Sequence, residues 1–133
     1  MPNATCVAVA GRGLLIEGSP GSGKSSLALA LIDRGAILVG DDGIALEVRG
    51  QRLWALPPPN ITGLLEIRGV GIAELAVGSA PVCLVLTIGD AGPRLPTEES
   101  VQLLGTTVPR LRFAPGAIDA LRAEWALRMH GLP

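Results

Sequence analysis

The stretch Gly18-Ser19-Pro20-Gly21-Ser22-Gly23-Lys24-Ser25 decides how this chain folds. It follows the pattern G-x-x-x-x-G-K-S, whose glycines let the backbone approach a ligand and turn several N–H groups toward one anion. The lysine and the hydroxyl at its end suit the outer phosphates of a nucleotide and a magnesium ion. The pattern therefore predicts a phosphate-binding loop, and we include the next residue, Ser26, among the nucleotide-binding candidates.

The segments on either side of this loop support the prediction. Residues 14–16 ahead of it are a short apolar run without helical period, which indicates a buried strand. Behind it, residues 27–32 carry apolar side chains at helical spacing, and Arg34-Gly35 is typical of a helix end. Residues 36–40 are a second apolar run. The sequence thus predicts a strand–loop–helix–strand unit with a right-handed crossover.

The composition limits the classes of protein to consider. At 133 residues, 48% hydrophobic and 17% charged, the chain fits one folded domain over residues 1–133 and excludes a disordered protein. Its apolar runs are too short to span a bilayer and no signal peptide is visible, so we expect a cytoplasmic protein without a membrane partner. A net charge of −1 without a basic cluster argues against nucleic-acid binding.

The remainder of the chain is predicted from its periodicity. Cys6 and Cys83 lie in apolar strand-like runs and are expected as buried apolar side chains, and His130 as a solvated one. For residues 100–104 the pattern leaves helix and strand open. The other expected elements are hairpins over 5–17 and 44–55, a central strand over 80–88, a loop over 89–96, an edge strand over 108–113 and a helix over 117–129, with Ile118, Leu121, Trp125 and Met129 along one side.

Two groups of charged residues are candidates for chemistry beside the loop. Asp41-Asp42 ends the strand after the loop's helix, at the strand end where α/β proteins bind ligands. One of these carboxylates suits magnesium and the other suits taking a proton from an attacking hydroxyl. Glu66 and Arg68 interrupt an apolar run over 61–71. Glu66 suits the metal and Arg68 the charge of a transferred phosphoryl group, but a salt bridge inside the sheet explains the pair equally well.

Three stretches together resemble the catalytic domain of the HPr kinase/phosphorylase family. They are the loop 18–25, the run Asp33-Arg34-Gly35-Ala36-Ile37-Leu38-Val39-Gly40-Asp41-Asp42, and Leu65-Glu66-Ile67-Arg68-Gly69-Val70-Gly71-Ile72, which is close to that family's L-E-I-R-G-x-G-I signature. They occur in the family's order and cover most of residues 3–75. The chain looks like a short form with the catalytic domain alone.

The resemblance implies an α/β P-loop fold with a mixed central sheet, similar to that of phosphoenolpyruvate carboxykinases. It also implies a magnesium-dependent kinase that phosphorylates a serine of an HPr-like phosphocarrier protein, with ATP or pyrophosphate as donor. Lys24 matches the phosphate-binding lysine, Ser25 the metal-binding hydroxyl, Asp41 the general base and Glu66 a metal ligand, while Arg68 lies inside the signature. Asp42 is then a further metal ligand, and a homo-oligomer is expected because family members often form hexamers.

The chain also departs from the family pattern. Asn3 stands where the family has a catalytic histidine, and asparagine gains no charge near neutral pH. The C-terminal third lacks the family's proline-glycine-arginine loop, which is tied to phosphorylase activity, so we do not expect that activity. These departures keep open a non-catalytic nucleotide-sensing module. A small-molecule P-loop kinase is a third alternative, although no arginine-rich lid segment is visible.

Overall fold

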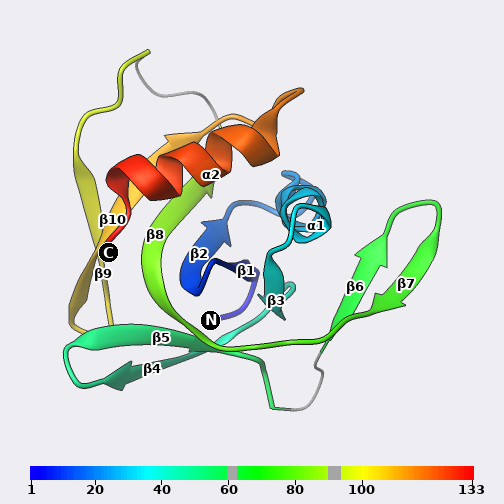
Figure 1. Ribbon diagram of the computed structural model, residues 1–133, viewed down its shortest axis with the longest axis horizontal. Coiled ribbons are helices and arrows are strands. Elements are labelled where there is room, and N and C mark those ends of the chain that lie inside the picture. Colours follow the sequence, from blue (N-terminus) through cyan, green and yellow to red (C-terminus); the bar gives the residue numbers. More distant parts are fainter. Residues whose placement is uncertain (60–62, 90–93) are drawn as a thin grey trace.

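A mixed β-sheet with two helices on one face forms the body of the protein. Figure 1 shows a computed structural model of the chain, which describes residues 1–59, 63–89 and 94–133. The elements are β1 (Ala4–Val9), β2 (Arg12–Glu17), α1 (Lys24–Asp33), β3 (Ile37–Gly40), β4 (Ala45–Arg49), β5 (Arg52–Leu56), β6 (Leu64–Ile67), β7 (Gly71–Glu74), β8 (Ala80–Ile88), β9 (Glu99–Leu103), β10 (Thr106–Phe113) and α2 (Asp119–His130).

The order of the main strands is β3-β1-β2-β8-β10-β9. β2 pairs with β8, and β8 with β10, in parallel, whereas β1 is antiparallel to both of its neighbours and β9 is antiparallel to β10. Because β1 reverses direction between them, β2 and β3 run the same way. The carboxyl ends of β2, β3, β8 and β10 therefore lie along one edge of the sheet, and α/β proteins bind their ligands at such an edge. The expected mixed α/β sheet is confirmed.

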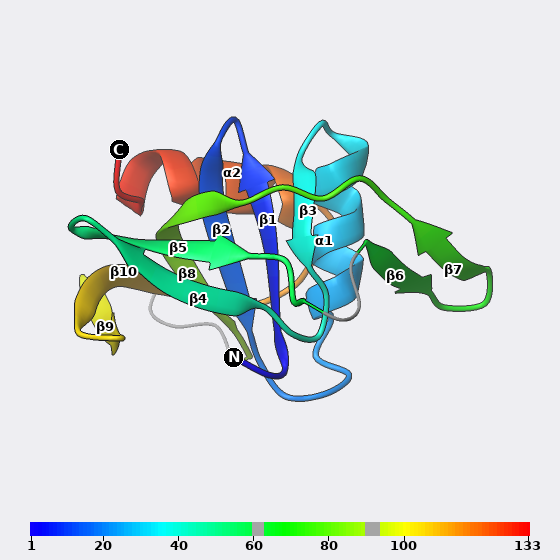
Figure 2. The same ribbon diagram turned by 90° about the horizontal axis from the view of Figure 1, so that it is seen from below.

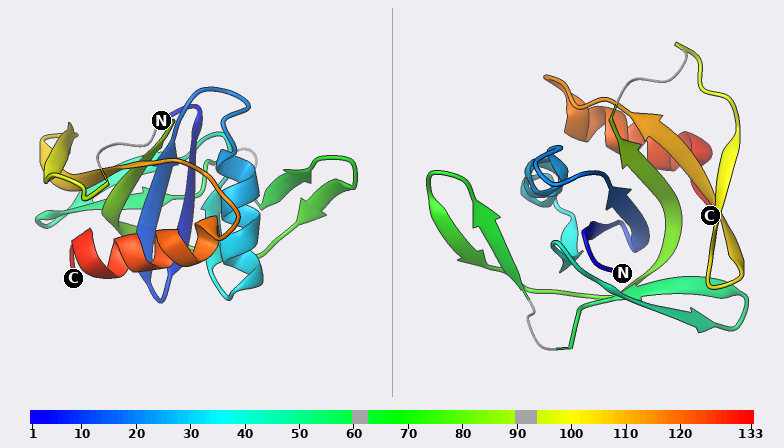
Figure 3. Two further views of the ribbon diagram at one scale, coloured as in Figure 1. Left: turned by 90° about the horizontal axis from the view of Figure 1, so that it is seen from above. Right: turned by 180° about the vertical axis from the view of Figure 1, so that it is seen from behind.

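Each face of the sheet is buried against a different layer (Figures 2 and 3). The helices α1 and α2 cover one face, where Leu27, Leu31 and Leu127 pack with strand residues such as Leu84. The β4–β5 hairpin crosses the opposite face, where Leu53 packs among residues of the other core cluster. Burial on both faces explains why the central strand β8 is apolar along almost its whole length.

Several sequence predictions are confirmed in outline. The hairpins β1–β2 and β4–β5 and the central strand β8 lie where they were expected, Cys6 and Cys83 are buried, and His130 is exposed. Of the undecided segment 100–104, residues 100–103 belong to strand β9 and Leu104 lies in the turn after it. Residues 90–93 of the expected loop, and Ile61 at the start of the apolar run 61–71, lie outside the described residues. No described helix has the length and apolarity that a membrane crossing requires.

Two predictions about strand positions are wrong. The segment 108–113 was expected at an edge, but β10 lies between β8 and β9, and β9 is the edge strand. One explanation of Glu66 and Arg68 placed them inside the sheet, yet the described part of their segment forms the separate β6–β7 hairpin, which projects from the body (Figure 1). Only Leu65 of β6 is fully buried, and Glu66 and Arg68 are exposed. Side chains alternate between the two faces of a two-stranded hairpin, so the charged side chains can reach water and do not need a partner.

The helix α2 packs by a different face from the one its large side chains indicate. Ile118, Leu121, Trp125 and Met129 are exposed, whereas a stripe of small residues is buried: Ala120, Ala123 and Ala126, with Leu127. Alanines let the helix backbone come close to the sheet and to α1. Both stripes have helical spacing, so periodicity alone could not identify the buried one.

Replacing Ala123 by leucine should lower the free energy of unfolding by about 1–3 kcal/mol, because the added methylenes have no space against the sheet. Met129→Ala on the exposed stripe should change it by less than about 0.5 kcal/mol. Urea unfolding followed by circular dichroism measures both. A larger loss for Met129→Ala than for Ala123→Leu would show that the wrong stripe has been assigned to the core.

Burial, and secondarily the proximity of Cys83, raises the pKa of the Cys6 thiol from about 9 to about 12. The folded state therefore favours the neutral thiol, and its contribution to stability is complete below pH 9. Above that the unfolded chain loses the proton first, so stability should fall between pH 9 and pH 12, by at most about 1.4 kcal/mol per pH unit. The difference between the parent and Cys6→Ala, followed by urea unfolding across this range, isolates the effect. A difference that does not change with pH would contradict it.

Candidate active site

The phosphate-binding loop connects the end of β2 to the start of α1. Gly21 and Gly23 have φ of 78° and 105°, a backbone region that side chains disfavour, so glycine is required at both positions. Gly23 is the N-cap of α1, and no side chain caps the first turn, which also contains no acidic residue. The free N–H groups and the positive end of the helix dipole are therefore directed at one place, which is suited to an anion.

The Lys24 side chain lies across its own loop and is only 7% exposed. Its Nζ donates hydrogen bonds to the carbonyl oxygens of Gly18, at 2.9 Å, and Ser19, at 3.1 Å. The Ser22 hydroxyl is buried in the same loop without a hydrogen-bond partner among the described residues. A buried hydroxyl left unpaired costs about 1–3 kcal/mol, which a ligand oxygen in the loop would recover.

The carboxylate of Asp41, the residue directly after β3, reaches the first turn of α1. The Ser25 hydroxyl donates a hydrogen bond to Asp41 Oδ1 at 2.7 Å, and the Thr5 hydroxyl donates to the same oxygen at 2.9 Å. Thr5 is fully buried in β1, the strand that lies between β2 and β3. Two hydroxyl donors on one oxygen fix the Asp41 side chain beside the phosphate loop.

The β6–β7 hairpin contributes the remaining charged residues. Glu66 and Arg68 line one cleft of about 350 Å³ together with residues of the loop, of the first turn of α1 and of the segment directly after β3. The further residues that line it are Pro20, Gly21, Gly23, Lys24, Ser25, Ser26, Asp41 and Asp42. Among the described residues, neither the Glu66 nor the Arg68 side chain has a hydrogen bond or a salt bridge. The salt bridge that was an alternative explanation of this pair does not form.

This arrangement corresponds to a known family of domains. A family model described as the HPr serine kinase C-terminal domain matches residues 2–78. The chain belongs to this family. Residues from β1 to the segment after the β6–β7 hairpin, and with them every residue of the cleft, fall within the matched region.

Individual relatives agree with the family assignment. The chain is 36% identical over 118 residues to an HPr kinase/phosphorylase of Streptococcus agalactiae, and 36% identical over 122 residues to one of Streptococcus thermophilus. These matches cover 77% and 80% of this chain but 38% and 40% of the relatives, so the chain spans about two fifths of their length. The solved Hpr(Ser) kinase/phosphatase of Coxiella burnetii superposes with a TM-score of 0.83 at 31% identity, covering 95% of this chain and 87% of that one.

Most of the residues predicted for this HPr serine kinase C-terminal domain come together in the cleft. Lys24, Asp41 and Arg68, predicted as catalytic, all line it, as do Ser25, Asp42 and Glu66, predicted as metal ligands. Of the predicted nucleotide-binding residues, Gly18, Ser19 and Ser22 lie in the loop but do not line the cleft. The two carboxylates of the Asp pair differ, because Asp41 is held by hydroxyls whereas Asp42 is exposed and has a φ of 59°.

Thr5 is the residue of this site that the sequence did not reveal. The strands β2 and β3 are not neighbours, so Asp41 does not reach Ser25 across adjacent strands but past the end of β1. The Thr5 hydroxyl supports this arrangement, because it also accepts a hydrogen bond from the backbone N–H of Asp42 at 3.4 Å. A hydroxyl inside an apolar strand was the available signal, although a threonine there is also common in ordinary strands.

The oxygen ligands in the cleft suit magnesium better than a softer metal. The described residues contain no group of three histidine, cysteine, aspartate or glutamate side chains able to hold a metal by themselves. Magnesium is usually held by one or two carboxylates together with phosphate oxygens and water, and it does not need such a cluster. A hydroxyl, Ser25, beside carboxylates and an anion-binding loop therefore fits a metal that arrives with its phosphate.

Asn3, which the sequence analysis set against the family's histidine, lies close to this site. It is exposed, has a φ of 60°, and donates its backbone N–H to the Asp42 carbonyl oxygen at 3.3 Å. The segment after β10 also approaches the phosphate loop, since Pro115 Cγ lies 3.8 Å from where a side chain on Gly23 would begin.

Thr5→Val should lower the free energy of unfolding by about 1–3 kcal/mol, because the Asp41 carboxylate loses one of its two hydroxyl donors and the backbone N–H of Asp42 loses its acceptor. The control Thr5→Ser keeps the hydroxyl and should lose less. Urea unfolding followed by circular dichroism measures both. An equal or larger loss in the serine variant would contradict a role for the Thr5 hydroxyl.

Proposed function

We propose that this chain is a magnesium-dependent phosphotransferase that moves a phosphoryl group from ATP, or from pyrophosphate, to a seryl hydroxyl of an HPr-like phosphocarrier protein. The observation that carries the proposal is the meeting of Lys24, Ser25 and Asp41 with Glu66 and Arg68 in one cleft. Transfer of a phosphoryl group depends mainly on positioning and charge neutralisation, and this set of side chains supplies both.

The phosphates would bind in the loop between β2 and α1. The backbone N–H groups at the start of α1 are free to bind them, and Lys24 exchanges its carbonyl partners, Gly18 and Ser19, for the outer phosphate oxygens. The unpaired Ser22 hydroxyl gains a partner at the same time. On the other side of the cleft, Arg68 neutralises charge on the phosphoryl group as it moves to the acceptor.

The acidic residues divide the remaining tasks. Asp41 accepts the proton of the attacking serine, and the hydroxyls of Ser25 and Thr5 keep its carboxylate in place. Ser25, Asp42 and Glu66 would hold magnesium, which when bound draws charge from the phosphate oxygens. We do not extend the proposal to phosphorolysis, because the C-terminal third lacks the proline-glycine-arginine loop that the family resemblance ties to that activity.

A second candidate function is a nucleotide sensor without phosphotransfer. It is favoured by Asn3, which cannot exchange a proton near neutral pH, and by the lack of the family's proline-glycine-arginine loop in the C-terminal third. In this alternative the loop binds the nucleotide as described, and the bound state is recognised by another protein. The two functions differ in whether a phosphoserine is formed.

The deciding experiment is incubation of the chain with ATP, magnesium and the host's HPr-like phosphocarrier, followed by mass spectrometry for phosphoserine. Formation of phosphoserine supports the kinase. Nucleotide binding without phosphoserine supports the sensor. Lys24→Ala serves as the negative control, because it removes the ammonium that the phosphates require.

Asp41→Asn should retain magnesium–nucleotide binding to within about threefold and lose at least about 100-fold in transfer, because an amide cannot take the serine proton. The matched variant Asp42→Asn should instead weaken metal-dependent binding. Initial rates with the phosphocarrier and calorimetric titration with the nucleotide separate the two effects. If Asp42→Asn abolishes transfer while Asp41→Asn weakens metal-dependent binding, the roles of the two carboxylates are reversed.

A further inference from the structure

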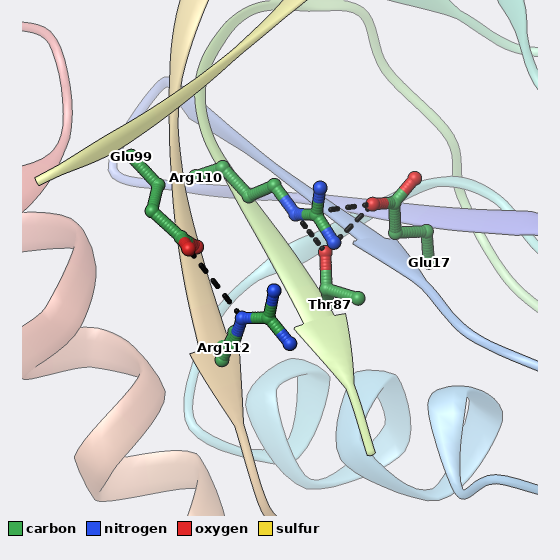
Figure 4. Close-up of polar contacts among 5 residues, drawn as sticks. All are labelled: Glu17, Thr87, Glu99, Arg110 and Arg112. Atoms are coloured by element: carbon green, nitrogen blue, oxygen red, sulfur yellow. Dashed lines mark hydrogen bonds and ion pairs between the residues drawn. The ribbon is translucent and has the colours of Figure 1, made fainter. Parts of the chain in front are cut away.

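A second polar cluster lies at the same edge of the sheet, outside the cleft. It consists of Glu17 at the end of β2, Thr87 near the end of β8, and Arg110 in β10 (Figure 4). The three strands are neighbours and run parallel, and the register places Glu17 opposite Thr87. The proposed reaction makes no use of these residues, so the cluster requires its own explanation.

The contacts in this cluster form a chain through the threonine. The Thr87 hydroxyl donates a hydrogen bond to Glu17 Oε1 at 2.6 Å and accepts one from Arg110 Nε at 2.7 Å. Arg110 Nε also lies 3.7 Å from Glu17 Oε1. The side chains of Arg110 and Glu17 are 30% and 28% exposed, so water screens them only in part. Hydrogen bonds to ionised groups are the stronger kind, and the threonine joins two of them.

The cluster ends at the first residue of the phosphate loop. Glu17 directly precedes Gly18, whose carbonyl oxygen accepts a hydrogen bond from Lys24 Nζ at 2.9 Å. Gly18 has close neighbours on both sides, since a side chain there would begin 2.7 Å from Ser22 Oγ and 3.2 Å from the Ile88 carbonyl oxygen. A small movement of Glu17 is therefore passed to the loop atoms that hold Lys24 and surround Ser22.

We propose that Thr87 and Arg110 are positioning residues for the phosphate loop, which act by holding the Glu17 carboxylate and with it the start of the loop. They set the place of the Gly18 carbonyl, and so of the Lys24 ammonium, before a nucleotide arrives. The inference rests on the proposed function only as far as the loop binds a nucleotide. It adds that β10, a strand outside the loop–helix unit, helps to set the affinity of the loop.

An ordinary ion pair at a sheet edge is the alternative, and the same strand provides one for comparison. Arg112 lies two residues beyond Arg110 on the same face of β10, and its Nε is 3.4 Å from Glu99 Oε1 (Figure 4). Its side chain is 56% exposed, and Glu99 belongs to β9 on the side away from the loop. The Arg112 side chain pairs with Glu99 and not with Glu17 or Thr87, so Arg112 is a matched control with similar side-chain chemistry.

The test compares Thr87→Val, Thr87→Ser, Arg110→Gln and Arg112→Gln in the full chain. Titration with magnesium–ATP should give about tenfold weaker binding for Thr87→Val and Arg110→Gln, the change that one hydrogen bond to a charged group corresponds to. Thr87→Ser keeps the hydroxyl and should bind like the parent, and Arg112→Gln should stay within about twofold. Parent-like binding by Thr87→Val, or an equal loss in Arg112→Gln, would overturn the proposal.

Amide hydrogen exchange over residues 17–24 of the free chain gives a readout that needs no nucleotide and no phosphocarrier. It should be faster in Thr87→Val and Arg110→Gln than in the parent, and unchanged in Arg112→Gln. Unchanged exchange in the first two variants would also overturn the proposal. If Thr87→Val does not fold, Arg110→Gln and Thr87→Ser still decide the outcome. Absence of phosphoserine from the transfer assay, with these differences present, would reject the kinase but not the positioning role.

Discussion

The hydrogen bond between the Ser25 hydroxyl and the Asp41 carboxylate is the contact on which the rest of the site depends. It joins the first turn of α1, which follows β2, to Asp41 at the end of β3, and β2 and β3 are separated in the sheet by β1. It forms because β2 and β3 run in the same direction, so that both end at one edge. Thr5 of β1, the strand between β2 and β3, donates a second hydrogen bond to the Asp41 carboxylate.

The burial of both faces of the sheet keeps this edge rigid. The helices cover one face and the β4–β5 hairpin covers the other, so the strands cannot slide without moving apolar side chains into water. Loops at the end of such a sheet can carry polar groups, because charged side chains stay hydrated there. The cleft and the Glu17–Thr87–Arg110 cluster both occupy this edge, on either side of the phosphate loop.

Family membership and geometry support different parts of the functional conclusion. The match over residues 2–78 contains the whole cleft, whereas β8, β9, β10 and α2 lie beyond it. The Glu17–Thr87–Arg110 cluster draws two of its three residues from these later elements. The residues of the cleft are therefore supported by both the family match and the geometry, and the cluster behind them by the geometry.

The sequence by itself was enough to locate the phosphate loop and the helix after it, and to select the aspartate pair and the Glu66–Arg68 segment as candidates for the site. Each of these inferences depends on residue types at local spacings, which backbone geometry dictates. It did not determine that β1 separates β2 from β3, that Thr5 holds Asp41, or that Thr87 links Arg110 to Glu17. These contacts join residues far apart in the chain, and strand order decides them. It also could not show which stripe of α2 is buried. The stripe of small residues and the stripe of large apolar residues share one helical period, and only close packing against the sheet selects the smaller side chains.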